Sequence, residues 1–302
     1  YDIAVTVRAC LRAGTHVDVA WAVETRGFAH WDRNEALAIT PGGGRVGSVL
    51  SGAADEWLAE GVAGGAVGRL VELKIGDVDA LVAGLPGGGE ARCLLVPADD
   101  LPGELWDRLV GREAVCLVTR LDGDRVVGTE VYDAATVGDA GEEVASLFGG
   151  ATTSTAKVDA AKVVTVLVPV PKLFVVGGGP IAEAVAAAAS LLGWRVRSFT
   201  DSGEATAHVT GLSALDSLVV FGHDDGLTGP ALMAGLASPV GYIGGVGPGR
   251  VQESRADWLR TRGIDDLSRI HGPAGLAIGA ATPAEIAVSV LAEAIAVRRS
   301  AG

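Results

Sequence analysis

Short apolar runs alternate with longer helical patterns in the second half of the chain, which is typical of alternating β-strands and α-helices. Residues 173–176 form an apolar, β-branched run of the kind found in a buried parallel strand. A glycine-rich turn follows, and residues 181–192 form an alanine-rich run of high helix propensity that Gly193 ends. Residues 194–199 then predict a second strand. The pattern therefore predicts a strand, a helix and a second strand in succession.

The turn between the first strand and this helix has the residue types of a dinucleotide-binding site. We expect Gly177 to allow the tight turn, Gly179 to let the backbone approach a pyrophosphate, and the small Ala182 to let the helix pack closely. Asp201 comes 201 − 179 = 22 residues after Gly179, close to the spacing of the acid that binds a ribose diol, and its charge disfavours a 2′-phosphate. The predicted cofactor-binding residues of this region are Gly177, Gly178, Gly179, Pro180, Ala182 and Asp201. The alternative is a Rossmann scaffold with an empty site.

A polar cluster follows the next predicted strand, residues 218–221. Ligands of open α/β sheets bind at the carboxyl ends of the strands, so we add His223 and Asp224 to the predicted cofactor-binding residues. With Asp225 they could form an acid–base group, because histidine titrates near neutral pH. The alternative is a loop whose acids hydrogen-bond their own backbone. No residue is assigned as catalytic, no metal site is expected, and His271 could line the same crevice or serve only as a turn residue.

The first half of the chain predicts a mixed antiparallel domain, because short alternating runs are separated by glycine turns. An Asp-Gly pair at 122–123 is a hairpin signal. We expect residues 54–60 to form a helix with Trp57 and Leu58 on its apolar side, and residues 149–157 to form a loop. Further strands are expected at 17–25, 36–40, 45–50, 91–96, 114–121, 126–132 and 163–168, and further helices at 103–110 and 141–148.

The length of 302 residues suits two domains, and prolines near the middle of the chain place their boundary near Pro169. We predict an α/β protein in which residues 1–168 form an N-terminal mixed α+β domain. Residues 169–302 form a C-terminal Rossmann-like parallel-sheet domain in this prediction.

The net charge of −13 argues against nucleic acid and against an anionic membrane surface as partners. Residues 226–249 carry no charge, but prolines and glycines interrupt them, so we expect a soluble chain and no membrane span. Cys10, Cys93 and Cys116 lack a CxxC spacing and lie in or beside apolar runs. This predicts buried, reduced thiols in a cytoplasmic protein, without a zinc or iron–sulfur site.

Several motifs accompany the glycine turn along the second half. They are residues 168–173, Gly222-His223-Asp224, Tyr242-Ile243-Gly244, and residues 271–276, 278–280 and 282–287. The combination resembles the XdhC/CoxI family, accessory proteins of molybdenum hydroxylases such as xanthine dehydrogenase, and the likeness covers nearly the whole chain. The resemblance implies a protein that binds the molybdenum cofactor (molybdopterin), helps it receive its terminal sulfur and delivers it to an apo molybdenum hydroxylase. A cysteine desulfurase is a further partner consistent with that role, and so is a homodimer.

The first half departs from the family pattern at two cysteine positions. Where the family usually carries Ser-Gly-Gly-Cys, this chain reads Ser51-Gly52-Ala53-Ala54, and Gly87 stands in place of a second cysteine. A thiolate can ligate molybdenum or hold a labile sulfur, whereas a methyl group or a hydrogen can do neither. If those cysteines handle the cofactor in relatives, this protein handles it differently or not at all. The family's Ser-Arg-Arg segment is also reduced, at residues 246–250, so we expect a weaker anion site there.

Three hypotheses for the function follow. The first is the accessory, cofactor-binding role implied by the resemblance, with the phosphate of the pterin at the glycine turn. The second is an NAD-dependent oxidoreductase that binds NAD(H) through the glycine turn and Asp201, with His223 as its candidate proton-transfer group. The third is a degenerate nucleotide-binding paralogue whose Rossmann half serves dimerisation or regulation.

Overall fold

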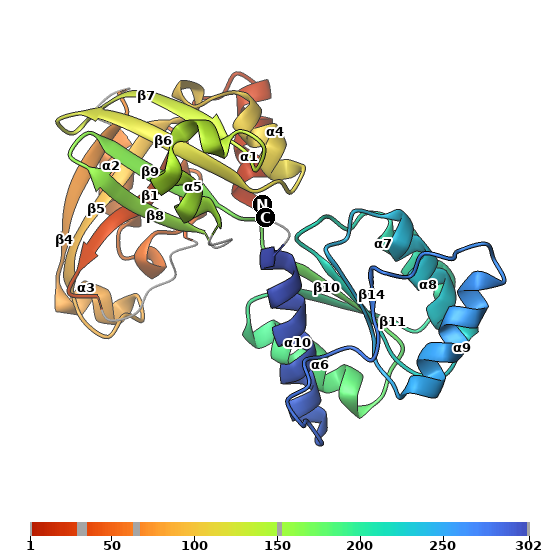
Figure 1. The fold of residues 1–302 in the computed structure, drawn as a ribbon. Helices are drawn as coiled ribbons and strands as arrows, with labels where there is room; N and C mark the ends of the chain where they lie inside the picture. The colour runs from red at the N-terminus through yellow and green to blue at the C-terminus, as the bar shows by residue number, and fades with distance from the viewer. Residues whose placement is uncertain (1, 29–34, 63–66, 150–152, 301–302) are drawn as a thin grey trace. The chain divides into compact units, whose positions relative to one another are not determined.

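The computed structural model describes residues 2–28, 35–62, 67–149 and 153–300. The chain forms two compact units, Tyr1–Pro169 and Val170–Gly302, drawn in Figure 1. Each unit has its own sheet and its own hydrophobic core, so each is described by itself.

The N-terminal unit is built on a nine-stranded antiparallel sheet with the strand order β3-β2-β1-β5-β4-β7-β6-β9-β8. Its strands are β1 (Asp18–Arg26), β2 (Leu37–Ile39), β3 (Arg45–Gly47), β4 (Arg69–Ile75), β5 (Gly89–Pro97), β6 (Val115–Asp122), β7 (Arg125–Tyr132), β8 (Ser154–Asp159) and β9 (Lys162–Leu167). Its helices are α1 (Asp2–Arg12), α2 (Asp55–Val62), α3 (Asp77–Val82), α4 (Glu104–Val110) and α5 (Glu142–Gly149). The expected hairpin at 122–123 is confirmed, since β6 and β7 pair across it.

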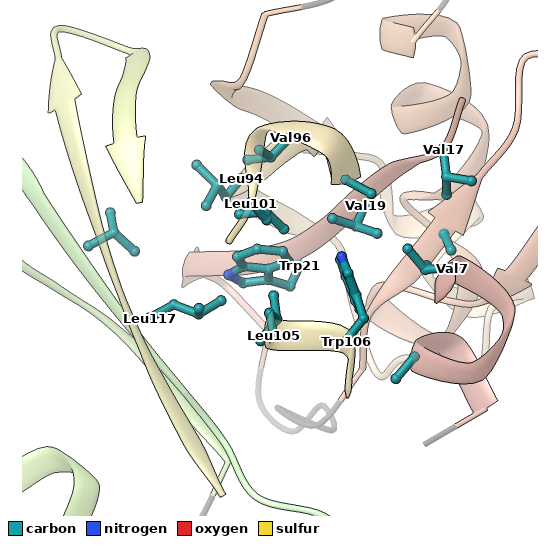
Figure 2. Packing of buried hydrophobic residues seen from close by; sticks show 14 of the residues in the cluster. Val7, Val17, Val19, Trp21, Leu94, Val96, Leu101, Leu105, Trp106 and Leu117 are labelled. Carbon is teal, nitrogen blue, oxygen red and sulfur yellow. The ribbon is translucent and has the colours of Figure 1, made fainter. Parts of the chain in front are cut away.

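This sheet curls until strands that are not neighbours meet. Trp21 on β1 donates a hydrogen bond of 2.9 Å from Nε1 to the hydroxyl of Thr165 on β9, although β5, β4, β7 and β6 lie between these strands. Figure 2 shows the Trp21 ring among apolar side chains of the core, beside Leu105 and Trp106 of α4 and Leu117 of β6. The curled sheet therefore contributes Trp21 and Leu117 to this core, and α4 contributes Leu105 and Trp106.

Two expectations for the first half were wrong. Trp57 is 55% exposed, while Leu58 is fully buried. Successive helical residues point about 100° apart, so on a short helix such as α2 only one of two neighbours lies on the narrow buried stripe. Residues 154–157 belong to β8 and not to a loop, because they pair with residues 163–166 of β9.

The C-terminal unit is built on a five-stranded parallel sheet with the strand order β11-β10-β12-β13-β14. The chain alternates β10 (Lys172–Val176), α6 (Pro180–Leu191), β11 (Arg195–Phe199), α7 (Ser202–Val209), β12 (Ser217–Val220), α8 (Asp225–Ala237), β13 (Tyr242–Gly245), α9 (Gly249–Arg260), β14 (Ile270–His271) and α10 (Pro283–Ser300). The predicted Rossmann-like parallel sheet is confirmed.

Helices cover both faces of this parallel sheet. Side chains of β10 alternate between two cores: Leu173 and Val175 pack with α6 and α10, while Phe174 and Val176 pack with α7, α8 and α9. Figure 1 shows the same layers, with α6 and α10 together on one side and α7, α8 and α9 on the other. Burial on both faces explains why the strands read as continuous apolar runs.

Candidate functional site

The strand order of the parallel sheet reverses direction at β10 and β12, and the carboxyl ends of these two strands are where a ligand crevice is expected. The chain passes from β10 to one side, to β11, and then returns to the other side, to β12. Connections that leave a sheet in opposite directions at one edge open a crevice there, and doubly wound sheets bind their ligands in it. The loops that follow β10 and β12 contain the glycine turn and residues 221–224.

The glycine turn has two residues that require glycine for different reasons. Gly177 and Gly179 both have a φ of +102°, a backbone conformation that side chains disfavour. A Cβ at position 177 would also clash with the carbonyl oxygen of Phe221, whereas a Cβ at 179 would meet nothing within 4 Å. The N–H groups of Gly178 and Gly179 donate to no residue that the structure describes. The turn therefore leaves open space and free donors at the start of α6.

Helix α6 begins as the sequence indicated. Pro180 is its first residue, where a missing N–H costs nothing. Ala182 is 3% exposed and packs in the core between α6 and the sheet. A larger side chain at 182 would push the helix, and with it the glycine turn, away from β10. The roles of Pro180, Ala182 and Gly178 towards a ligand remain predictions.

Asp201 lies two residues beyond the end of β11 and caps the next helix. Its Oδ1 accepts a hydrogen bond of 2.8 Å from the N–H of Glu204, which makes it the N-cap of α7. One carboxylate oxygen is thus engaged within the chain. The side chain is exposed, and its ribose-binding role remains a prediction.

Of the two acids after β12, Asp224 hydrogen-bonds its own backbone, which is the alternative weighed from the sequence, whereas Asp225 bonds a side chain of α9. Asp224 Oδ1 accepts from the N–H groups of Gly226 (2.8 Å) and Leu227 (3.3 Å), so Asp224 is the N-cap of α8. Asp225 Oδ2 accepts from the hydroxyl of Ser254 on α9 at 2.6 Å. His223 is exposed, and its ring contacts none of the described side chains by hydrogen bond or ion pair. Cofactor binding by His223 and Asp224 remains a prediction.

Two side chains of α9 hold the loops that follow β12 and β13. Arg255 is 3% exposed and donates to the carbonyl oxygens of Gly222 (2.8 Å) and Val246 (3.0 Å). Gln252 donates from its amide to the carbonyl oxygens of Gly245 and Gly247, each at 2.9 Å. Burial lowers the pKa of Arg255, but an arginine starts so high that it stays charged. Sequence reasoning missed both residues.

His271 belongs to a structural cluster. Its ring stacks on Tyr242 with centroids 5.1 Å apart, and its Nδ1 lies 3.8 Å from Glu293 Oε1. Glu293 Oε2 accepts from the Tyr242 hydroxyl at 2.6 Å and from the N–H of Gly275 at 2.8 Å. These contacts join β13, β14 and α10, and they support the structural interpretation of His271.

The cysteines are poor candidates for handling a metal or a labile sulfur. Burial raises the pKa of Cys93 to about 12 and that of Cys116 to about 11, so both are neutral thiols at physiological pH. Cys10 is half-buried. Ala54, at one family cysteine position, is fully buried beside α2. Within the described ranges there is no group of three or more His, Cys, Asp or Glu that could hold a metal ion.

The N-terminal unit contains a pocket of ≈ 440 Å³ over β1, β4 and β5. Arg92 is one of the residues that line it, with ion-pair distances of 3.4 Å to Glu24, 3.3 Å to Glu72 and 2.6 Å to Asp124. The arginine is therefore neutralised inside the pocket. Nothing in this arrangement points to a particular ligand.

None of the helices that the structure describes is long and apolar enough to cross a membrane. The uncharged segment 226–249 folds instead into α8, β13 and the turns beside them.

Comparisons with known proteins agree on the kind of domain at this site. Residues 173–294 match the family model of the XdhC Rossmann domain. The uncharacterized protein YqeB of Escherichia coli is 29% identical over 154 residues; the match covers 43% of this chain and only 28% of that relative's length. A solved structure described as a xanthine dehydrogenase from Bacillus halodurans covers 99% of this chain and 96% of its own, with a TM-score of 0.55 and 17% identity. At that identity the likeness shows a shared fold alone.

Proposed function

We propose that this chain, which belongs to the XdhC family, is an accessory protein that binds the molybdenum cofactor. In this role it supports the maturation of a molybdenum hydroxylase of the xanthine or carbon monoxide dehydrogenase type. One observation carries the proposal. The segment that matches the XdhC Rossmann domain, residues 173–294, includes the glycine turn, Asp201 and the loop after β12. These features follow β10, β11 and β12, three strands that end at the same carboxyl edge of the sheet.

The residues present fit the phosphate end of the cofactor. The free N–H groups of Gly178 and Gly179, the open space at Gly179 and the positive end of the α6 dipole together suit a phosphate. When bound, the cofactor supplies the molybdenum and its dithiolene chemistry. In this proposal the glycine turn binds the phosphate of the cofactor and so orients the whole cofactor.

Neither the two buried cysteines nor the two family cysteine positions offer a thiolate for the metal end of the cofactor. Cys93 and Cys116 are buried and protonated, and the family positions at 54 and 87 are Ala and Gly. We therefore propose that this chain holds the cofactor while a cysteine desulfurase supplies the terminal sulfur. The apo-hydroxylase then receives the finished cofactor from it.

A second candidate is an NAD-dependent oxidoreductase, and the position of Asp201 after β11 favours it. This activity needs a proton-transfer group near the nicotinamide. His223, exposed on the loop after β12, is the candidate in the crevice.

Reconstitution of an apo-hydroxylase tests the accessory role. Apo xanthine dehydrogenase would be mixed anaerobically with molybdenum cofactor, with and without the purified chain, and xanthine oxidation would be followed. We expect the chain to raise the yield of active enzyme and the Gly179→Asp variant to lose that effect. Arg260→Gln, which changes an exposed residue of α9, is the matched control. Equal yields with and without the chain would refute the accessory role.

A further inference from the structure

Arg255 is a buried cation that contacts two loops at the carboxyl edge of the parallel sheet. It is 3% exposed, and its guanidinium donates to Gly222 O after β12 and to Val246 O after β13. Arg255 forms no ion pair with any residue of the described ranges. A buried charge that forms no ion pair is costly, and a ligand of opposite charge would offset part of that cost.

The hydrogen bonds from Arg255 also fix the direction of two backbone N–H groups. In a trans peptide the C=O and the N–H of one unit point in opposite directions. Both units are trans, so turning Gly222 O towards Arg255 points the N–H of His223 away from it. The bond to Val246 O does the same to the N–H of Gly247. Neither N–H donates to a residue that the structure describes.

These two donors lie beside the glycine turn. The loop with His223 follows β12, the loop with Gly247 follows β13, and β12 pairs directly with both β10 and β13. Unpaired N–H groups thus follow three adjacent strands at one edge of the sheet, and clustered backbone N–H groups bind oxyanions. The N–H groups of Gly178 and Gly179 are the first pair, and those of His223 and Gly247 are the second.

We infer that the N–H groups of His223 and Gly247 form a second oxyanion subsite, held and made electropositive by Arg255. The two subsites together suit a ligand with two linked phosphate groups, which is a diphosphate. The inference rests on the proposed ligand role of the glycine turn. It also changes the expectation of a weaker anion site at residues 246–250, because Arg255, further along α9, adds a positive charge to this reduced segment.

Two carboxylates follow β12, and neither forms an ion pair with Arg255. Asp224 accepts two N–H groups at the start of α8, where the helix dipole offsets its charge. Asp225 accepts from Ser254, while its buried Oδ1 has no donor among the described residues. Asp225 is thus the group that favours the charged form of Arg255 without forming an ion pair with it.

A titration of the unaltered chain with inorganic pyrophosphate, followed by amide NMR, tests the inference. We expect the amide signals of all four residues, Gly178, Gly179, His223 and Gly247, to shift and saturate together. Inorganic phosphate should bind about tenfold more weakly, because it fills one subsite at a time. Shifts confined to Gly178 and Gly179 would overturn the second subsite and leave the glycine turn intact as a site. No shift at any of the four would overturn both.

Variants of Arg255 distinguish the effect of its charge on pyrophosphate affinity from its effect on the fold. Arg255→Met removes the charge and the donors, and we expect it to weaken pyrophosphate binding about tenfold. Arg255→Lys keeps the charge and should recover part of that loss. Arg260→Gln removes the same charge from an exposed position of α9 and should change affinity by less than about twofold, since exposed charges are screened. A folded Arg255→Met variant that binds pyrophosphate as tightly as Arg260→Gln would refute the inference.

Discussion

The hydroxyl of Tyr242, at the start of β13, donates a hydrogen bond of 2.6 Å to Glu293 Oε2 on α10. Tyr242 is 1% exposed, and both its burial and the Glu293 carboxylate raise its pKa far above the ordinary value. The hydroxyl therefore remains a donor at physiological pH. Because Glu293 also accepts from the N–H of Gly275, this contact ties the last helix to the loop that closes the parallel sheet.

Replacing Tyr242 with phenylalanine should destabilise the C-terminal unit. The change removes the hydroxyl that donates to the largely buried Glu293 carboxylate. Because a buried acceptor is then left with one donor fewer, we expect the free energy of unfolding to fall by about 1–3 kcal/mol. Urea unfolding of the full chain measures it. Tyr132→Phe is the control, since Tyr132 makes the same kind of bond to the more exposed Glu130, and it should cost less than about 1 kcal/mol. Equal losses would contradict this interpretation.

The alternating half of the fold could be predicted from the sequence because its strands are buried on both faces. Residues 173–176 and 218–221 are apolar throughout, and no other element type fits such short runs beside glycine turns. The first half was harder to predict. Helix α1 and strand β4 contain charged residues at most of their exposed positions, and β4 is defined by pairing with residues of β5 that are 14 or more positions away in sequence. Long-range pairing of this kind leaves little local signal.

The two strained glycines of the turn should respond differently to alanine. Both have a φ of +102°, which costs an alanine about 1–2 kcal/mol. At Gly177 the new methyl group also meets Phe221 O, so Gly177→Ala should lower the melting temperature more than Gly179→Ala. Differential scanning calorimetry on both variants checks the order. A larger loss at 179 would mean that the space around the turn is not as described.

The cysteines should react in a defined order with iodoacetamide at pH 8. A thiol with a pKa of about 11, such as Cys116, is ionised there in about one molecule in a thousand, and Cys93, with a pKa of about 12, still less. We expect modification of Cys10 alone in the folded chain, and of all three thiols in urea. Mass spectrometry of digests reads this out. Rapid labelling of Cys93 without unfolding would contradict its burial.

Acid should weaken the N-terminal unit through Asp133. The hydrogen bond from Arg108 comes first among the causes that lower the pKa of Asp133 to about 2. A carboxyl whose pKa is lower in the folded chain stabilises it above the unfolded pKa, near 4, and loses this contribution as the pH falls towards 2. Asp133→Asn should therefore make unfolding less sensitive to pH between about 4 and 2. An unchanged pH profile would show that the pair contributes nothing.

The positions of the glycine turn after β10 and of Asp201 after β11 could be predicted from the sequence because their spacing follows from the strand–helix–strand geometry. Arg255 and Gln252 could not. They lie three residues apart in the middle of α9, where polar residues usually face solvent, and only the folded sheet brings them under the loops after β12 and β13. The cap roles of Asp201 and Asp224 were hidden for a similar reason, since an acid before a helix suits a cap and a ligand site equally well.

Calorimetric titration of the purified chain with molybdenum cofactor and with NADH, under anaerobic conditions, tests the proposed role most directly. We expect saturable binding of the cofactor, loss of that binding in Gly179→Asp, and unchanged binding in Arg260→Gln. Retention of affinity after alkylation of Cys10 would show that the thiols are dispensable for binding. Binding of NADH without any binding of the cofactor would contradict the accessory role and favour the oxidoreductase.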